Sequence, residues 1–583
     1  MDTVKSFKGY GKVNHELEQQ AEQAFRRRVF WRRVFIVALV VFLLALVAGI
    51  AAFTVIKKKG SSSSPAGLVP TQLTPSASLK AICGVTPYPD SCFSSISKLE
   101  TNQTTDPEVL FKLSLRVAVE ELSRLSGYPK KLQAKATDPR LRKALAVCDS
   151  VLEDAIDHLN DSISSMEVGQ GKSLLSVSKI DDLKTWLSAS LTDQETCLDA
   201  LEELNSTLLP STRTQMSNST EFVSNALAIA SKIMSLLVNF NIPIHRRLMG
   251  YKQGFPEWVS RGDRRLLQEN NLTVHVTVAK DGTGDFTTIG EAVDRVPKKK
   301  DARFVIHVKQ GVYVENVLLD KGKWNVMIYG DGKDKTIVSG SLNFVDGTPT
   351  FATATFAVQG KGFMARDIGF INTAGPQKHQ AVAFRSGSDL SVYYRCSFDG
   401  YQDTLYAHSN RQFYRDCDIT GTIDFIFGNA AVVFQGCTIQ PRQPLPNQFN
   451  TITAQGKKEV DQNTGISIQK CTFSAKDANL TALTYLGRPW KEFSTTVIMQ
   501  SEIGSFLNPL GWKEWVNNVD PPSTIFYAEY SNSGPGSSVD QRVKWAGYKP
   551  TLTLDEASKF SVEYFIQGPD WLPDAGVEFD AKV

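Results

Sequence analysis

A short cysteine motif recurs at nearly constant spacing in the second half of the chain, and it constrains the fold more than any other feature. Arg-Cys-Ser-Phe (395–398), Asp-Cys-Asp-Ile (416–419) and Gly-Cys-Thr-Ile (436–439) are offset by 21 and 20 residues. Lys-Cys-Thr-Phe (470–473) follows after a longer insert, and Asp-Ile-Gly-Phe (367–370) precedes the series. A period of about 20 residues made of short strands and turns predicts a β-solenoid, in which successive coils pair as parallel strands.

Two aspartates share one phase of this repeat. Asp403 lies seven residues after Cys396, and Asp424 lies seven residues after Cys417. Residues of equal phase stack in neighbouring coils, so the two carboxyl groups should stand side by side. Two carboxylates this close in a partly dry groove cannot both ionise easily, which makes one a candidate acid and the other a nucleophile or base. Both could instead be turn aspartates, but the flanking apolar residues 425–427 favour an active site.

The composition argues against several classes of function. With 583 residues the chain is long enough for several domains, and its net charge of +3 gives no bias toward nucleic acid. The eight cysteines form no CxxC pair, and no HExxH motif occurs, so the sequence predicts no metal and no other cofactor. A serine esterase is unsupported because the chain has no G-x-S-x-G motif.

The N-terminal segment is organised around one uncharged apolar run. Residues 1–33 form a basic tail, and 34–56 are 23 residues without a charge, which is long enough to span a bilayer. The arginines before this run outnumber the lysines behind it, so the positive-inside rule places the N-terminus in the cytosol. We predict a single transmembrane signal anchor rather than a cleaved signal peptide, whose apolar core is shorter and nearer the start. A Ser/Pro-rich linker, 57–79, follows.

Residues 80–240 have a helical pattern. Apolar residues recur at spacings of three and four in the stretches 141–159, 180–191 and 222–237. This periodicity predicts an all-α antiparallel four-helix bundle. No cluster of catalytic residue types occurs here, so a binding or folding module is the favoured interpretation.

Several features indicate export and processing. Six N-x-S/T glycosylation sequons follow the apolar run, at Asn102, Asn160, Asn205, Asn218, Asn271 and Asn479. The simplest of three pairing schemes for the cysteines of the helical region gives Cys83–Cys92 and Cys148–Cys197. The connector 241–268 holds two dibasic sites, ending at Arg247 and Arg265. Exposed connectors are where proteolytic nicking concentrates, so a processing protease is expected to act there.

The pattern changes to short β-rich runs from residue 269 onward. The runs 304–308, 326–329 and 336–339 are bounded by Gly, Asn and Asp. Together with the 20-residue period they predict one solenoid over 269–583. Its aromatic residues could line a polysaccharide groove, although aromatic residues in a solenoid more often belong to the core.

Five motifs of the second half together resemble plant pectin methylesterases. They are GVYVEN (311–316), QAVAFR (380–385), GYQDTLY (400–406), GTIDFIFGN (421–429) and LGRPW (486–490). In the helical region, SLTDQETC (190–197) is similar to the inhibitor domain found in the precursors of this family. The resemblance implies a mainly β protein: a right-handed parallel β-helix preceded by an inhibitor-like pro-domain.

The resemblance also implies roles for individual residues. Asp424 resembles the nucleophile that attacks the methyl ester of galacturonate. Asp403 resembles the general acid that protonates methanol and then the base that activates water. Five further positions match: Gln402 and Gln380 as oxyanion donors, Arg488 as the partner that orients Asp424, Trp490 as a sugar-stacking residue and Thr355 as a substrate contact. These residue types suit the chemistry, since a carboxylate nucleophile benefits from a cation and an oxyanion needs fixed donors.

The column of cysteines leaves its pairing open on geometric grounds. Parallel coils bring Cys396, Cys417 and Cys437 within disulfide range of their neighbours, so any adjacent pair could bond. The resemblance implies the pair Cys417–Cys437.

Two other functions remain as alternatives. Stacked carboxylates suit a retaining glycosidase, but the neighbouring amides serve an acyl oxyanion better. A β-helix that only binds pectin, or a chain that mainly inhibits, is the non-catalytic alternative, which the complete residue set disfavours. The expected partners are methyl-esterified homogalacturonan, inhibitor proteins, the processing protease and, through the anchor, the membrane. The expected location is a secretory membrane precursor whose mature domain reaches the cell wall.

Overall fold

The computed structural model describes residues 74–99, 104–166, 177–239 and 273–583. Several predicted features lie outside these described residues: the tail 1–33, the span 34–56, nearly all of the linker 57–79, the dibasic sites at Arg247 and Arg265, and the sequons at Asn102 and Asn271. Within the described ranges, no helix is both long enough and apolar enough to cross a bilayer. The other four sequon asparagines are all exposed: Asn160, Asn205, Asn218 and Asn479.

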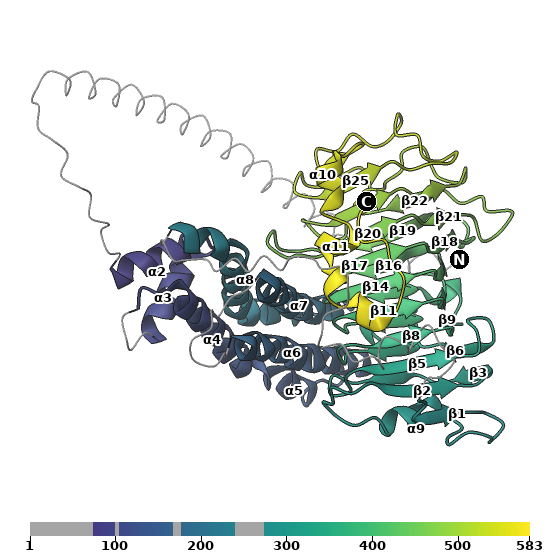
Figure 1. The fold of residues 1–583 in the computed structure, drawn as a ribbon, viewed down its shortest axis with the longest axis horizontal. Helices are drawn as coiled ribbons and strands as arrows, with labels where there is room; N and C mark the ends of the chain where they lie inside the picture. The colour runs from purple at the N-terminus through teal and green to yellow at the C-terminus, as the bar shows by residue number, and fades with distance from the viewer. Residues whose placement is uncertain (1–73, 100–103, 167–176, 240–272) are drawn as a thin grey trace, which may run out of the picture. The chain divides into compact units, whose positions relative to one another are not determined.

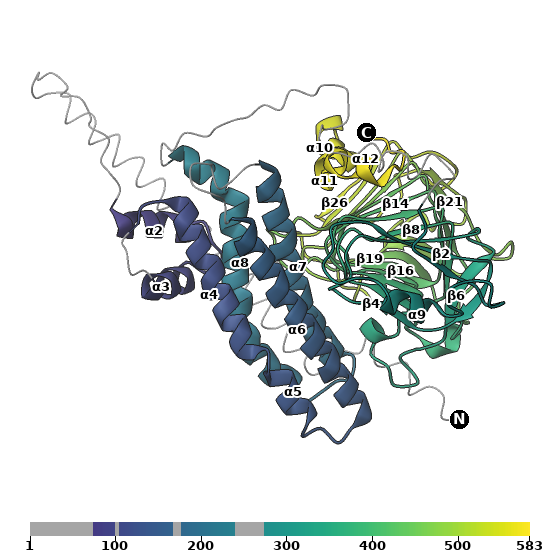
Figure 2. The same ribbon diagram turned by 60° about the horizontal axis from the view of Figure 1, so that its bottom comes forward.

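The first described region is helical. Its helices are α2 (Pro75–Cys83), α3 (Pro89–Leu99), α4 (Pro107–Leu125), α5 (Tyr128–Gln133), α6 (Pro139–Ser165), α7 (Val177–Glu202) and α8 (Leu209–Asn239). The four longest, α4, α6, α7 and α8, run alongside one another as a closed bundle (Figure 2). Asp106 and Asp138 cap α4 and α6 by accepting a backbone N–H, and each precedes a proline that suits the first helical turn.

Two disulfides fix the bundle. Cys83 bonds to Cys92, which joins α2 to α3, and Cys148 bonds to Cys197, which joins α6 to α7. Both pairings match the scheme predicted from the sequence. The second bridge is buried among apolar side chains at helical spacing on α6, including Leu152.

The second described region consists of three parallel sheets that share one winding chain (Figure 1). The first sheet contains, in spatial order, β1 (Val276–Val278), β2 (Phe304–Val308), β5 (Val326–Gly330), β8 (Met364–Arg366), β11 (Ser391–Tyr394), β14 (Arg411–Arg415), β17 (Ala431–Gln435), β20 (Gly465–Gln469), β23 (Thr495–Met499), β25 (Phe526–Tyr530) and β26 (Tyr548–Lys549). The second contains β3 (Gly311–Val314), β6 (Thr336–Gly340), β9 (Gly369–Asn372), β12 (Ser397–Asp399), β15 (Asp418–Gly421), β18 (Thr438–Pro441), β21 (Thr472–Phe473) and β24 (Glu502–Ile503). The third contains β4 (Val317–Leu319), β7 (Phe356–Val358), β10 (Phe384–Ser386), β13 (Leu405–Ala407), β16 (Ile423–Gly428), β19 (Asn450–Gln455) and β22 (Thr484–Gly487).

Short helices cover parts of this parallel β-helix. They are α9 (Ile289–Asp294), α10 (Leu554–Ser558), α11 (Val562–Phe565) and α12 (Leu572–Ala575). The C-terminal helices pack on the outer face of the first sheet, where Val562 and Leu572 join a buried cluster with Val392 and Phe413. This packing protects that face from solvent.

The sequence repeat marks one corner of every coil. Phe370, Phe398, Ile419, Ile439 and Phe473 pair in series across the second sheet, so all five predicted repeats are in register. The residue that opens each of the four cysteine motifs has a left-handed backbone, with φ between 52° and 66° at Arg395, Asp416, Gly436 and Lys470. This conformation turns the chain sharply from the first sheet into the second and points the next side chain into the core.

The interior is filled by stacked aromatic rings. Tyr393, Tyr414 and Phe434 stack in series, with ring centroids 4.3 Å and 4.6 Å apart. Phe356 stacks on Phe384 in the same way, at 5.5 Å. Such ladders arise because parallel coils place equivalent side chains directly above one another.

The predicted Cys417–Cys437 disulfide is wrong for this structure. Cys396, Cys417, Cys437 and Cys471 are all buried free cysteines. The Cys417 thiol donates to the carbonyl of Tyr393 (3.4 Å), and the Cys437 thiol donates to that of Tyr414 (3.5 Å). Each sulfur also contacts its neighbours in the column, since the Cys417 thiol interacts with the thiols of both Cys396 and Cys437. The four thiols therefore form a reduced column inside the core.

Candidate active site

The two aspartates of the repeat come together on the third sheet. Leu405 of β13 pairs with Ile426 of β16, which places Asp403 and Asp424 at equal phase on adjacent coils. The backbone N–H of Asp403 donates to the carbonyl of Ile423, 3.0 Å away. Both aspartates have a left-handed backbone, with φ of 62° and 52°. Left-handed non-glycine residues cost about 1–3 kcal/mol each and cluster at functional sites.

Asp403 favours its protonated form. Its side chain is almost completely buried, and burial is the main cause that raises its pKa well above the usual range. The negative charges of Asp424 and Glu203 add to this rise, and the charge of Arg488 opposes it. With the bundle in place Asp403 is therefore a carboxylic acid, and the charge of Asp424 continues to raise its pKa when Glu203 leaves.

Asp424 is held as a carboxylate acceptor from two sides. The Arg488 guanidinium donates through Nε to Oδ1 (2.8 Å) and through a terminal nitrogen to Oδ2 (2.5 Å). The Thr451 hydroxyl donates to Oδ1 (2.6 Å), and the same hydroxyl oxygen accepts the backbone N–H of Asp424 (3.0 Å). This bidentate ion pair with an added hydroxyl fixes the orientation of the carboxylate.

A β-bulge brings Thr451 to this position. Ile423 pairs with Thr451 and Ile426 pairs with Thr453, so β16 contains one more residue than β19 over this interval. Bulges re-aim side chains and often lie beside active sites. Here the bulge contains Asp424 and turns its side chain toward Thr451 and Arg488.

We expect Thr451→Val to lower kcat about tenfold and to cost about 1–3 kcal/mol of stability, because the buried backbone N–H of Asp424 loses its acceptor. Valine keeps the shape of the side chain but removes the hydrogen bond that orients the Asp424 carboxylate, which is worth on the order of 1–3 kcal/mol when an ion is involved. Thr453→Val is the matched control, because the Thr453 hydroxyl donates to the carbonyl of Leu486 and not to the aspartate. Steady-state methanol release measures both variants, and equal rates for the two would contradict a positioning role.

The two predicted amide donors lie on neighbouring coils beside Asp403. Gln402 precedes Asp403 in the chain, and Ala381, next to Gln380, donates its backbone N–H to the Gln402 carbonyl (3.2 Å). Gln380 and Gln402 are both buried. Within the described residues, neither side-chain amide takes part in an intramolecular hydrogen bond. Both NH₂ groups are thus free to donate to a ligand atom.

Aromatic residues line the far side of Arg488. The Trp490 ring stacks near Trp515, with centroids 6.4 Å apart, and the Arg488 guanidinium lies 4.1 Å from the centre of the Trp515 ring. Tyr406 stacks on Phe427 at 4.2 Å. These rings form an apolar floor of the kind that sugar rings stack on.

Thr355 is the predicted residue that the structure does not bring to this group. It lies immediately before β7, it is fully buried, and its hydroxyl donates to the carbonyl of Ile371 (3.0 Å). Among the described residues, it forms no hydrogen bond with the other predicted site residues. Its role as a substrate contact stays a prediction.

Two residues of the site escaped the sequence analysis. Thr451 lies 27 residues after Asp424 because an insert lengthens that coil, so the period of about 20 residues does not reveal it. Trp515 comes from a loop outside the repeat and carries no motif. The one indication in the sequence is that Trp515 is aromatic and lies in the region whose aromatic residues are expected to line a groove.

Residues of helix α7 lie directly against this site. The carboxylate of Glu203, one residue past the helix end, accepts the backbone N–H of Thr350 (3.1 Å). The Thr192 hydroxyl accepts from the Asn429 amide (2.8 Å), and the Thr196 hydroxyl lies 2.9 Å from Nε2 of His408. The third sheet is therefore covered by the helical bundle where the two aspartates lie.

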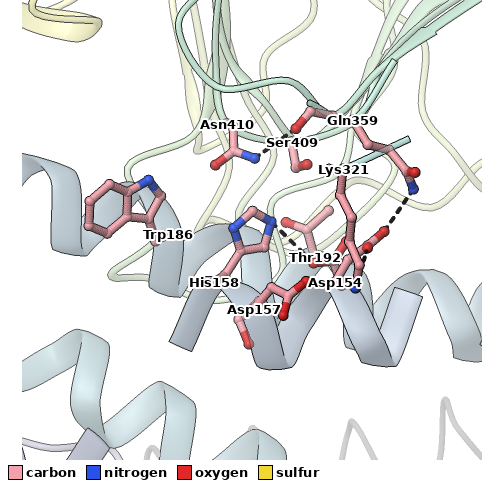
Figure 3. Close-up of polar contacts among 12 residues, drawn as sticks. Asp154, Asp157, His158, Trp186, Thr192, Lys321, Gln359, Ser409 and Asn410 are labelled. Atoms are coloured by element: carbon pink, nitrogen blue, oxygen red, sulfur yellow. Dashed lines mark hydrogen bonds and ion pairs between the residues drawn. The ribbon is translucent and has the colours of Figure 1, made fainter. Parts of the chain in front are cut away.

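Helix α6 adds charged contacts to the same face (Figure 3). Asp154 accepts a hydrogen bond from the Gln359 amide (2.7 Å), and Lys321 pairs with Asp157 at 2.6 Å and with Asp154 at 3.4 Å. His158 of the next turn is half-buried, and desolvation lowers its pKa to about 4. The interface between the bundle and the β-helix is thus rich in ionisable groups.

Comparison with known proteins identifies both regions. Residues 275–569 match the family model for pectinesterase. The chain is 64% identical to pectinesterase 3 of Phaseolus vulgaris over 594 residues, and the alignment covers all of both chains. It is 59% identical to pectinesterase 1 of Arabidopsis thaliana, over 99% of each chain. The chain belongs to the pectinesterase family.

The two regions of this pectinesterase have different relatives. Residues 77–229 match the model for plant invertase and pectin methylesterase inhibitors, so an inhibitor-family bundle precedes the esterase. The solved pectin methylesterase from carrot is 49% identical and superposes with a TM-score of 0.52. It covers 54% of this chain and 100% of its own, so the β-helix region alone corresponds to a complete relative.

Proposed function

We propose that this pectinesterase hydrolyses pectin methyl esters through a covalent bond to Asp424. The Asp424 carboxylate attacks the ester carbonyl carbon, and the NH₂ groups of Gln402 and Gln380 donate to the resulting oxyanion. The C–OCH₃ bond then breaks, and protonated Asp403 gives its proton to the leaving methoxide oxygen, which departs as methanol. The products of this half-reaction are a galacturonyl–Asp424 anhydride and an ionised Asp403.

The second half-reaction restores the enzyme. Ionised Asp403 removes a proton from water as the water oxygen attacks the galacturonyl carbon. The bond to Asp424 breaks and returns that carboxylate to its ion pair with Arg488. Asp403 is protonated again, and the product carboxylic acid loses its proton to solvent. One water is consumed and one methanol released per cycle.

One observation carries this assignment: two aspartates at equal phase have different partners. Arg488 and Thr451 both bind Asp424, whereas the pKa of Asp403 is raised by burial and by its acidic neighbours. An enzyme that uses one aspartate as the acid and another as the nucleophile needs the two side chains to lie in different environments. The two unpaired amides beside Asp403 favour ester hydrolysis over glycoside hydrolysis, which develops positive charge on the sugar.

We expect Gln402→Ala to lower kcat by about 10²–10³-fold with little change in KM. The amide would contact the oxyanion more strongly than the neutral ester, so its loss acts on the transition state. Methanol release from highly methylated pectin measures the effect in the 269–583 fragment. Gln310→Ala removes an exposed amide of the same β-helix and is the control. A Gln402→Ala variant with full kcat would remove this residue from the mechanism.

We also propose how the precursor is delivered. The run 34–56 anchors it with the N-terminus in the cytosol, cleavage after Arg247 or Arg265 frees the β-helix, and the mature domain acts in the cell wall. The charge asymmetry around the run and the two dibasic pairs support this proposal. The coverage of the third sheet by α7 supports an inhibitory role for the bundle before cleavage.

A further inference from the structure

The Lys491 ammonium forms its ion pairs with the inhibitor-like bundle. Lys491 follows Trp490 in the loop after β22, and its ammonium donates to Glu195 (2.8 Å) and to Asp199 (2.6 Å), which lie one turn apart on α7. Within the described β-helix, no carboxylate pairs with Lys491. Burial disfavours the ammonium, but the two acidic partners outweigh burial and raise the Lys491 pKa. Removing α7 would leave this cation without a counter-charge.

Arg411 is a second cation that pairs with the bundle, and its partners differ from those of Lys491. Arg411 also binds the bundle, through Asp182 (2.8 Å), but it has its own β-helix partner in Asp389 (2.7 Å). Arg411 therefore keeps a carboxylate when the bundle leaves. Lys491 has no such partner in the described β-helix. Its ammonium would therefore be open to a new anion, whereas the Arg411 guanidinium would stay paired.

The surroundings of Lys491 suit a sugar acid. Its ammonium lies 5.1 Å from the centre of the Trp490 ring, and Lys458 lies 3.9 Å from the same Glu195 carboxylate. Trp490, Lys458 and Lys491 line one cavity with Tyr406. Lys458 keeps Glu492 of the β-helix as a partner at 3.3 Å, so a pyranose stacked on the indole would direct its carboxylate to the Lys491 ammonium.

We propose that Lys491 binds the free carboxylate of an already demethylated galacturonate residue, and that Glu195 and Asp199 occupy this subsite in the uncleaved chain. The proposal rests on the proposed pectin esterase function. A methyl ester is neutral, whereas the product of each turnover is an anion, so an ammonium at this place distinguishes the two. The enzyme would bind best where a neighbouring unit has already lost its methyl group.

The test measures binding and kinetics in the 269–583 fragment, whose counterpart from carrot is a complete chain. Hexagalacturonate without methyl esters is the probe, titrated by calorimetry. We expect Lys491→Gln to raise its Kd about tenfold, because a charge-assisted contact is lost. Lys491→Arg keeps the charge and should restore most of the binding. Lys549→Gln, which removes a lysine paired with Glu556 far along the chain, is the matched control and should leave Kd unchanged.

The kinetic readout separates this subsite from the catalytic machinery. Lys491→Gln should raise KM for partly demethylated pectin several-fold, with kcat and the KM for fully methylated oligomers unchanged. Thermal unfolding confirms that the variant is folded. Unchanged Kd and KM in folded Lys491→Gln would overturn the proposal and leave Lys491 as a tether for α7. Hexagalacturonate binding by the uncleaved chain as tight as by the fragment would also overturn it.

The outcomes also separate this proposal from the esterase function. A fragment that releases no methanol yet binds hexagalacturonate through Lys491 would refute the esterase mechanism and keep the subsite. A fragment that releases methanol while Lys491→Gln behaves as wild type would do the reverse.

Discussion

Asp424→Asn in the 269–583 fragment is expected to lose on the order of 10⁴–10⁶-fold in kcat, as removal of a nucleophile does elsewhere. An amide cannot attack the ester, and it also replaces the charge that Arg488 binds. The guanidinium would keep one acceptor oxygen, so the fold should persist. Methanol release from highly methylated pectin is the measurement, with a detection limit at least 10⁵-fold below the wild-type rate.

The control for this loss is Asp346→Asn, which removes an exposed carboxylate paired with Lys378 on the same β-helix. It should retain full activity. A folded Asp424→Asn fragment with more than about 1% of the wild-type rate would argue that another group attacks the ester. The wild-type fragment releasing no more methanol than Asp424→Asn would favour a β-helix that only binds pectin.

Removal of the bundle is expected to raise activity at least about 10³-fold. Glu203, Asp199 and Thr192 of the α7 region contact the β-helix at the site, so a polymer cannot enter while they are bound. The linker keeps the bundle at an effective concentration on the order of millimolar. For a bundle that binds the β-helix with a Kd on the order of micromolar, the bound form then outweighs the open form about 10³-fold. A protease site placed in 241–268 lets the same molecules be assayed before and after cleavage and separation. Equal rates before and after would show that the bundle does not block the site.

The affinity of the separated bundle should fall as pH rises. Burial raises the pKa of Glu203 to about 7 and those of Asp154 and Asp199 to about 6. In the complex Glu203 stays protonated up to about pH 7, and Asp154 and Asp199 up to about pH 6. In the separated parts these carboxyl groups ionise near pH 4, so a rise in pH from about 4 favours dissociation. His158 and His408 act oppositely as pH falls below 6.5, and so does Glu195, whose pKa its lysine partners lower against burial. Burial raises the pKa of further bundle carboxyl groups, Asp182 and Asp193, so the groups that favour dissociation remain the more numerous.

We expect the Kd of the bundle for the β-helix to rise at least tenfold between pH 5 and pH 7.5. Glu203→Gln should flatten this dependence, because glutamine cannot ionise. Calorimetric titration at both pH values measures the change, and a Kd that falls with pH would contradict this account.

The sequence predicted those parts of the site that follow the repeat. Asp403 and Asp424 could be placed side by side because parallel coils convert a 21-residue offset into contact. Thr451 could not, since the insert before β19 and the bulge at Asp424 both break that period. The disulfide prediction failed at Cys417 and Cys437, because equal phase brings the two thiols into contact but does not require them to form a bond.

The order of the two regions along the chain has a consequence during synthesis. Helices α6 and α7 precede every strand of the β-helix, and domains generally fold as they leave the ribosome, N-terminal first. Arg488 and Lys491 belong to one of the last coils to be made. The carboxylates that bind Lys491 are already in place when that coil closes. The newly made β-helix therefore closes its catalytic groove against a bundle that is already folded.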